Sequence, residues 1–138
     1  MKTDNPYGAV GITTIVNLPY AEAIERAKAA LKEEGFGILT EIDVSATLKQ
    51  KLNVDFHPYI ILGACNPALS HRALSANPAV GLMLPCNVVV EERDDGCLIS
   101  AMDPEAGMRA FDAGDELKAV ATEAKVRLTR AIAAVAKH

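Results

Sequence analysis

The residues best suited to chemistry gather in two Cys-Asn pairs. Cys65 and Asn66 stand in the stretch GACNP, and Cys86 and Asn87 stand in the stretch LPCNV. One histidine, His71, follows six positions after Cys65. Thiols and imidazoles serve proteins as nucleophiles, as bases and as ligands of soft metals. We therefore take all five residues as a candidate ligand-binding site, and Cys65, His71 and Cys86 as candidate catalytic residues.

The pattern around Cys65 predicts a strand that passes directly into a helix. Asn66 is a favoured N-cap residue, and Pro67 suits the first helical position. The unpaired amides and the positive end of the helix dipole would favour a thiolate just before such a helix. A free cysteine is also a common small core residue. The residue types favour a buried Cys65, and a reactive thiol stays open as the alternative.

Metal binding by these residues is not favoured by their spacing. Two thiols and His71 would suit zinc or copper(I) if the fold brought them together. The sequence has no Cys-x-x-Cys pair, so we predict no metal site. His57 precedes a proline and is interpreted as a solvated loop residue. No motif for a hydrolase triad, a P-loop or a zinc protease occurs, so neither a reaction nor a cofactor can be assigned.

The composition predicts one soluble domain over residues 1–138. Half of the residues are hydrophobic, and the net charge is -4. An acidic chain lacks the basic stripe that nucleic acids and anionic membranes require. Three cysteines do not form a disulfide framework, which favours a reducing compartment. The N-terminus does not resemble a signal peptide, and no apolar run is long enough to span a membrane. We expect a cytoplasmic protein.

The hydrophobic periodicity predicts an α+β fold. Strands are expected at 7–16, 36–44, 59–65, 80–92 and 97–102. Helices are expected from a first turn at Pro19 to a stop at Gly35, and at 45–52, 67–77 and 112–137. Asp95-Gly96 is a strong hairpin signal between the last two strands. The predicted architecture is a largely antiparallel sheet with the main helices on one face, and a doubly wound parallel sheet is the weaker alternative.

Several side-chain placements follow from these predicted elements. Ser45 is expected to cap the short helix. Phe36, Ile38, Ile42 and Val44 are expected on one buried face of the second strand. If the fourth strand has no bulge, Cys86 shares a buried face with Leu82, Leu84, Val88 and Val90. Because the strands of Cys65 and Cys86 both look apolar, we expect the two thiols to lie near each other.

Three stretches of the chain resemble a known family. GFGILTEIDVSATLKQKL, YIILGACNPALSHRAL and GLMLPCNVVVEE together are similar to the domain of unknown function 302 family. The resemblance runs from about Tyr7 into the C-terminal helix. It implies a curved antiparallel sheet similar to the TATA-box-binding-protein fold, and a homodimer. It implies no reaction, and fold likeness does not transfer DNA binding to an acidic chain.

Three functions stay open on the sequence alone. The first is a small-molecule-binding module with a pocket near Cys65, His71 and Cys86. The second is a thiol-dependent redox enzyme or a soft-metal-binding protein that uses Cys65 and Cys86. The third is a structural or interaction protein whose homodimer is the functional unit. The apolar content and the alanine-rich C-terminal helix support a homodimer in each case.

Overall fold

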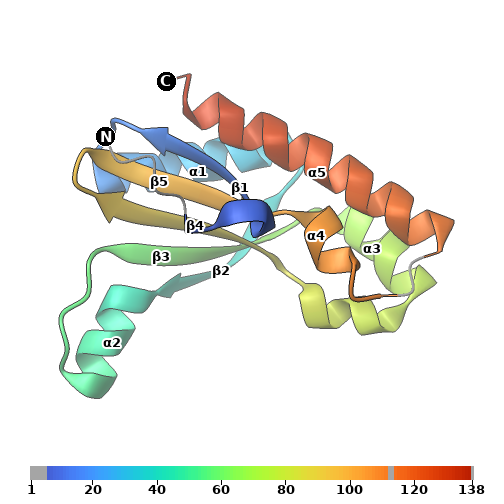
Figure 1. Cartoon of the computed structure of the whole chain (residues 1–138), viewed down its shortest axis with the longest axis horizontal. Coiled ribbons are helices and arrows are strands. Elements are labelled where there is room, and N and C mark those ends of the chain that lie inside the picture. Colours follow the sequence, from blue (N-terminus) through green and yellow to red (C-terminus); the bar gives the residue numbers. More distant parts are fainter. Residues whose placement is uncertain (1–5, 112–113, 138) are drawn as a thin grey trace.

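The computed structural model describes residues 6–111 and 114–137. Five antiparallel strands form one sheet in the order β1-β5-β4-β3-β2 (Figure 1). The strands are β1 (Gly11–Val16), β2 (Gly37–Asp43), β3 (Tyr59–Cys65), β4 (Cys86–Arg93) and β5 (Gly96–Met102). The α-helices are α1 (Tyr20–Glu33), α2 (Val44–Leu52), α3 (Pro67–Ala76), α4 (Pro104–Met108) and α5 (Asp115–Val135), and two 3-10 helices are η1 (Gly8–Val10) and η2 (Pro78–Met83).

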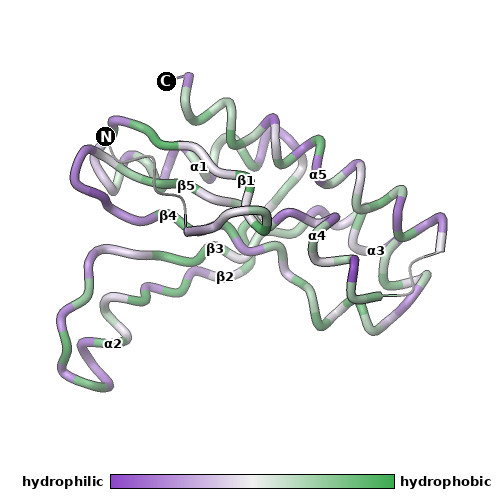
Figure 2. Tube along the Cα trace, viewed as in Figure 1, coloured by the Kyte–Doolittle hydropathy of each residue, from purple (hydrophilic) through white to green (hydrophobic). Residues whose placement is uncertain are grey.

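The long helices α1 and α5 pack on one face of the sheet, here called the helix face. Leu62 of β3, Val90 of β4 and Ile99 of β5 point to this face and are buried in the main core. The opposite face, here called the open face, carries the alternate residues of the same strands. In Figure 2 the turn between β4 and β5 is hydrophilic. The predicted α+β class, with helices on one face of an antiparallel sheet, is confirmed.

A second hydrophobic cluster lies beyond one end of the sheet. There α3, η2 and α4 pack against the N-terminal half of α5 (Figure 1). Its buried members are Leu69, Ala73, Val80, Leu117, Val120 and Ala124. Helix α2 extends from the other end of the sheet, and none of its residues is buried. The two ends of the sheet therefore differ in what covers them.

The local signals around Asn66 and Asp95-Gly96 are confirmed. The Asn66 side chain accepts a hydrogen bond from the Leu69 amide at 3.2 Å, and Pro67 begins α3. Gly96 has a φ of 143° in the turn that joins β4 to β5. A side chain at that position would also meet the Val16 carbonyl oxygen. The cap and the turn themselves are formed by residues within a few positions of each other, which is why sequence patterns predict them well.

The predicted continuous strand at 80–92 is wrong in its first half. Residues 78–83 form η2, and a cis peptide bond joins Leu84 to Pro85. The Asn77 side chain starts η2 by accepting from the Ala79 amide at 3.0 Å. Strand β4 begins only at Cys86, so Leu82 does not share its face and is 85% exposed. An Asn-Pro start and a second proline interrupt a stretch whose hydrophobicity alone is typical of a strand.

Three smaller predictions are also corrected. The strand expected from residue 7 starts at Gly11, because Gly8 adopts a φ of 49° in η1. Asp43, and not Ser45, caps α2 by accepting from the Ala46 amide at 2.9 Å. The expected buried face of β2 is broken by a register shift between Ile38 and Thr40. Among the four residues expected on it, Phe36 is buried and Ile42 is 49% exposed.

The predicted C-terminal helix is confirmed from Asp115 onward, and residues 112–113 lie outside the described part. Within that part, no helix is long and apolar enough to cross a membrane.

Candidate functional site

The two cysteines of the predicted site lie at the same end of the sheet. Ala64 pairs with Cys86, so Cys65 lies one residue beyond that pair on the neighbouring strand. The Cys65 Sγ lies 3.3 Å from the Ser70 Oγ of α3. Cys86 lines a cavity of about 40 Å³ together with Ser70, Leu69 and other residues of the second hydrophobic cluster. Such a cavity can hold about one water molecule, and drug-sized ligands occupy roughly 300–1,000 Å³.

Burial controls the chemistry of the Cys86 thiol. Loss of solvent, with a smaller contribution from nearby Cys65, raises the pKa of Cys86 to about 11. The thiol therefore stays protonated at neutral pH, whereas nucleophilic catalysis and metal binding need the thiolate. The third cysteine, Cys97, is fully buried in the main core.

Asn66 is buried at the cysteine end of the sheet, and its side chain bonds to backbone atoms. It is 8% exposed, and its amide nitrogen donates to the Glu34 carbonyl oxygen at 3.5 Å. Its side chain thus links the start of α3 to the C-terminal end of α1. Gly35 is needed beside it, because a Cβ there would lie 2.9 Å from the Asn66 amide nitrogen.

The other two predicted residues are not brought to the thiols. His71 is exposed on α3, and the contact of Cys65 is made with Ser70 instead. Asn87 is exposed and lines a separate hollow on the open face with Tyr7 and Val89. In residues 6–111 and 114–137, no three His, Cys, Asp or Glu side chains are grouped so that they could hold a metal ion.

A different polar cluster lies at the opposite end of the sheet. Glu91 of β4 is 5% exposed and points to the open face, opposite Tyr59 of β3. Its Oε1 lies 2.9 Å from the His57 Nε2 and accepts from the Arg93 Nε at 3.0 Å. Its Oε2 accepts a hydrogen bond from the Tyr7 hydroxyl. One buried carboxylate thus holds three side chains from three segments of the chain.

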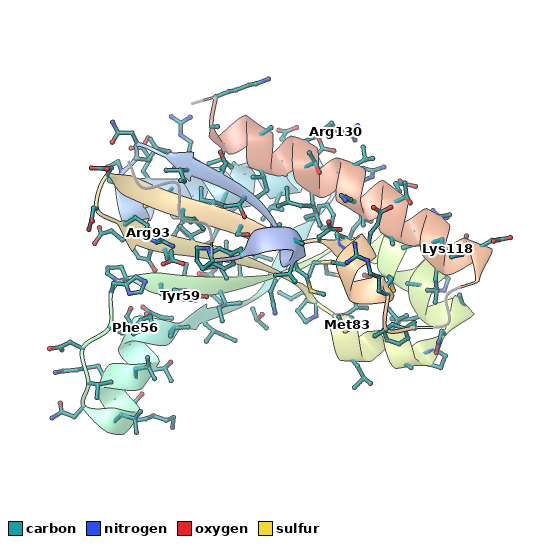
Figure 3. The ribbon with its side chains drawn as sticks, in the orientation of Figure 1. Phe56, Tyr59, Met83, Arg93, Lys118 and Arg130 are labelled. Atoms are coloured by element: carbon teal, nitrogen blue, oxygen red, sulfur yellow. The ribbon has the colours of Figure 1, made fainter. Side chains whose placement is uncertain are left out.

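The loop before β3 places His57 next to Glu91. The Glu92 amide donates to the Pro58 carbonyl oxygen at 2.9 Å, which extends the pairing of β4 onto this loop. The His57 ring stacks on Phe56 with centroids 4.4 Å apart, and Tyr59 meets it edge-on at 6.0 Å. Figure 3 shows Phe56, Tyr59 and Arg93 gathered at this end of the sheet, far from Met83 at the other.

The N-terminal segment brings Tyr7 across the open face. The turn of η1 is closed by the Val10 amide, which donates to the Tyr7 carbonyl oxygen at 3.1 Å. Gly11 permits this close approach, because a Cβ there would lie 2.8 Å from the Tyr7 Cβ and 2.4 Å from the Ser100 Oγ. Burial and the hydrogen bonds to Glu91 and Tyr59 raise the pKa of Tyr7, so its hydroxyl stays a proton donor.

Glu91 is a carboxylate despite its burial. Burial by itself raises its pKa, but the hydrogen bonds from Tyr7, His57 and Arg93 outweigh that effect and the net pKa is lowered. An ionised carboxylate only accepts hydrogen bonds. The His57 Nε2 must therefore carry a proton, which leaves the Nδ1 of the neutral ring as an acceptor.

These side chains border an open cleft of about 720 Å³. The side chain of His57 is 44% exposed and that of Arg93 is 26% exposed, whereas that of Glu91 is 7% exposed. The cleft is lined by Leu18, His57, Glu91, Glu92, Arg93, Asp94 and Gly96. Glu92 and Asp94 add negative charge at its rim. The volume falls within the range of small-molecule sites, and the lining combines acidic, basic and imidazole groups.

Comparison with known proteins identifies the family. The sequence pattern of the family described as "Domain of unknown function DUF302" matches residues 12–135. The chain belongs to this family. Its fold is similar to the crystal structure of the uncharacterized conserved protein DUF302 from Bacillus stearothermophilus, with 32% sequence identity and a TM-score of 0.84. The similarity covers 92% of this chain and 98% of that one. No curated protein matches the chain.

Membership of the DUF302 family confirms the resemblance drawn from GACNP and LPCNV, and the likeness to the TATA-box-binding-protein fold stays a prediction. The cluster around Glu91 was missed by sequence reasoning. Glu91 and Tyr7 are 84 positions apart, and Glu91 and His57 are 34 apart. The one local signal is the acidic pair that ends the apolar run NVVVEE, and such a pair is usually solvated.

Proposed function

We propose that this DUF302 protein is a small-molecule-binding module and that the cleft beside Glu91 is its binding site. The observation that carries the proposal is a buried carboxylate that holds His57 and Arg93 side by side in a cleft of ligand size. Convergent polar groups in a concave site are typical of ligand pockets. The proposal keeps the ligand-binding function expected from the sequence and moves its site away from the cysteines.

The donor and acceptor groups of Arg93 and His57 that do not bond to Glu91 support the proposal. Arg93 uses its Nε on Glu91, and its two Nη groups make no hydrogen bond to the described residues. His57 likewise uses only one ring nitrogen on a described residue. A cluster built for stability alone would have no need to hold such groups at a cleft. Preorganised groups at a binding site lower the entropy cost of binding a ligand.

The test is a ligand screen by two-dimensional NMR on isotope-labelled protein. Small carboxylic acids, amines and sugars are added singly, and the expected result is saturable shifts of the signals of residues 91–96 and 57–59. Arg93→Gln should weaken binding of the best compound at least tenfold. Arg72→Gln, which changes an exposed arginine of α3, is the matched control and should leave binding unchanged. Absence of shifts in the cleft at millimolar concentrations of every class would contradict the proposal.

The thiol end supports a second candidate, the thiol-dependent redox or soft-metal protein. The observation in its favour is that Cys86 and Ser70 share one small cavity while Cys65 contacts Ser70. The raised pKa of Cys86 and the exposed position of His71 argue against it. Iodoacetamide at pH 6.5 separates the two candidates, because only a low-pKa thiol reacts quickly there. Rapid labelling of Cys65 or Cys86 in the folded protein would favour the thiol function.

We also propose that the protein is a homodimer. The open face of the sheet bears two exposed isoleucines, Ile15 of β1 and Ile42 of β2, which are 40% and 49% exposed. A second copy would bury them, and two-fold dimers are the commonest oligomers. Sedimentation of the wild type at micromolar concentration should give a dimer, and Ile42→Glu should give a monomer. A wild-type mass of 14.6 kDa in solution would contradict this part of the proposal.

A further inference from the structure

We propose that His57 and Glu91 form a proton-transfer pair that acts on a small monocarboxylic acid held by Arg93. The inference rests on the proposed binding function of the cleft and adds a reaction to it. The class of substrate is a 2-oxo acid that has a hydrogen on the carbon next to its ketone. His57 is the catalytic base, Arg93 binds the carboxylate, and Glu91 is a positioning residue.

The contact between Glu91 and His57 prepares the imidazole as a base. The carboxylate accepts from Nε2 at 2.9 Å, so the unprotonated Nδ1 is the nitrogen available to a ligand. When Nδ1 takes a proton, the adjacent negative charge stabilises the imidazolium that forms. Histidine is the side chain that most often performs such transfers near neutral pH. Glu91 itself is shielded, because Tyr7 and Arg93 occupy its other acceptor positions.

Arg93 supplies the means of holding a carboxylate. Its Nε bond to Glu91 fixes the guanidinium plane, and neither Nη group makes a hydrogen bond within the part of the chain that the structure describes. A guanidinium with two free donors binds a carboxylate through two parallel hydrogen bonds. Its exposed fraction of 26% allows a ligand to reach it. Arg93 and His57 bond to the same Oε1 atom, so a molecule bound by one lies beside the other.

The charges at the rim of the cleft disfavour substrates that carry more than one negative charge. Glu92 and Asp94 lie on either side of Arg93 in the sequence and line the same cleft. Together with Glu91 they outnumber the one guanidinium, so a doubly charged phosphate ester would be repelled more strongly than a monocarboxylate. Leu18, which also lines the cleft, offers an apolar contact to the rest of a small ligand.

The reaction balances without any further reactant. His57 Nδ1 removes a proton from the carbon next to the ketone, and the electron pair of that C–H bond forms the C=C bond of an enolate. The charge that develops on the ketone oxygen is offset by the nearby guanidinium. The imidazolium then returns a proton to the carbon. In D2O the ring exchanges its proton with solvent, so each cycle replaces one carbon-bound hydrogen with deuterium.

Pyruvate in D2O gives a direct test, because its methyl signal in the proton NMR spectrum disappears as deuterium enters. The wild-type protein should accelerate exchange at least tenfold over buffer. His57→Gln keeps an amide donor for Glu91 and removes the base, so the rate should fall to the buffer level. His71→Gln, on a helix that does not line the cleft, is the matched control and should exchange as the wild type does.

Two more variants separate positioning from binding. Glu91→Gln should lower the maximal exchange rate about tenfold and leave the pyruvate concentration at half-maximal rate unchanged, because the imidazolium loses its charged partner while Arg93 still binds the carboxylate. Arg93→Gln should mainly raise the pyruvate concentration at half-maximal rate. A wild-type rate equal to that of buffer, or an unchanged rate in His57→Gln, overturns the inference. If pyruvate still shifts the NMR signals of the cleft in that case, the proposed binding function stands alone. If no compound of the screen shifts them, both proposals fail.

Discussion

The two ends of strand β4 hold polar groups in different ways. At Cys86 the polar neighbours are neutral, and Asn66 serves the fold by capping α3 and by donating to the Glu34 carbonyl oxygen. At Glu91, five residues or roughly 17 Å away, polar side chains from the residue before η1, from the loop before β3 and from β4 converge on one carboxylate. The first end closes a small apolar cavity, and the second borders an open cleft. The comparison shows that residue types known for reactivity can lie at a closed, apolar end of the sheet, while residue types that are usually solvated build the proposed site.

Replacing Glu91 with alanine should have the largest effect on stability. Arg93, His57 and Tyr7 would lose their shared acceptor, and removing one partner of a buried ion pair costs about 3 kcal/mol. Urea denaturation measures the loss. Glu92→Ala, on the same strand but exposed, is the matched control and should change stability by less than about 0.5 kcal/mol. If Glu91→Ala and Glu92→Ala lower stability equally, the Glu91 carboxylate does not hold its cluster together, and the two ends of β4 do not differ in this way.

The contribution of Glu91 should depend on pH with a definite sign. Its pKa in the folded state lies below the ordinary value of 4.5 that applies in the unfolded chain. The stabilisation is therefore fully present above pH 4.5 and is lost as the pH falls through the lower folded value. The stability difference between the parent and Glu91→Gln, both in a His57→Gln background, should shrink below pH 4.5. A difference that grows on acidification would contradict the lowered pKa.

Cys86 should react slowly with iodoacetamide at pH 7.5. A pKa of about 11, against an ordinary value of 9.0, leaves about 100-fold less thiolate than in an unfolded chain. Labelling followed by mass spectrometry of peptides compares folded and urea-unfolded protein. Cys65, which is partly exposed, serves as the internal comparison in the same sample. Rapid labelling of folded Cys86 would contradict the raised pKa and would indicate a reactive thiol at the Cys86 end of β4.

Asn66→Ala should cost about 1 kcal/mol, because the Leu69 amide loses its side-chain acceptor. Asn77→Ala removes the corresponding cap of η2 and is a useful control, since its bond to the Ala79 amide lies at an exposed turn. Thermal or urea denaturation measures both. If Asn66→Ala is harmless while ligand binding at this end changes, Asn66 is a ligand-binding residue and the cap is incidental.

The same comparison explains how far the sequence could predict this molecule. The cap at Asn66 and the turn at Asp95-Gly96 arise from residues within a few positions, and both were predicted. Strand β4 was predicted too long because Pro85 and the η2 segment are apolar enough to fit a strand pattern. The Glu91 cluster could not be predicted, since it depends on the β3–β4 register and on the path of η1 across the open face. The cysteines were selected as candidates by residue type alone. The side chains that line the cleft come from distant positions in the sequence, so no local pattern selects them.

Cys65→Ser should have the smallest effect, less than about 0.5 kcal/mol. The Cys65 Sγ is partly exposed and lies 3.3 Å from the Ser70 Oγ, so a serine hydroxyl would find a hydrogen-bond partner there. Cys97→Ser is the contrasting variant, because that thiol is fully buried and its single acceptor, the Leu18 carbonyl oxygen, lies 3.5 Å away. A shorter hydroxyl there would be poorly bonded, at a cost of roughly 1–3 kcal/mol. Thermal denaturation of both serine variants beside their alanine counterparts separates the cases. If Cys65→Ser is much worse than Cys65→Ala, Cys65 is a core residue and has no place in any site at this end.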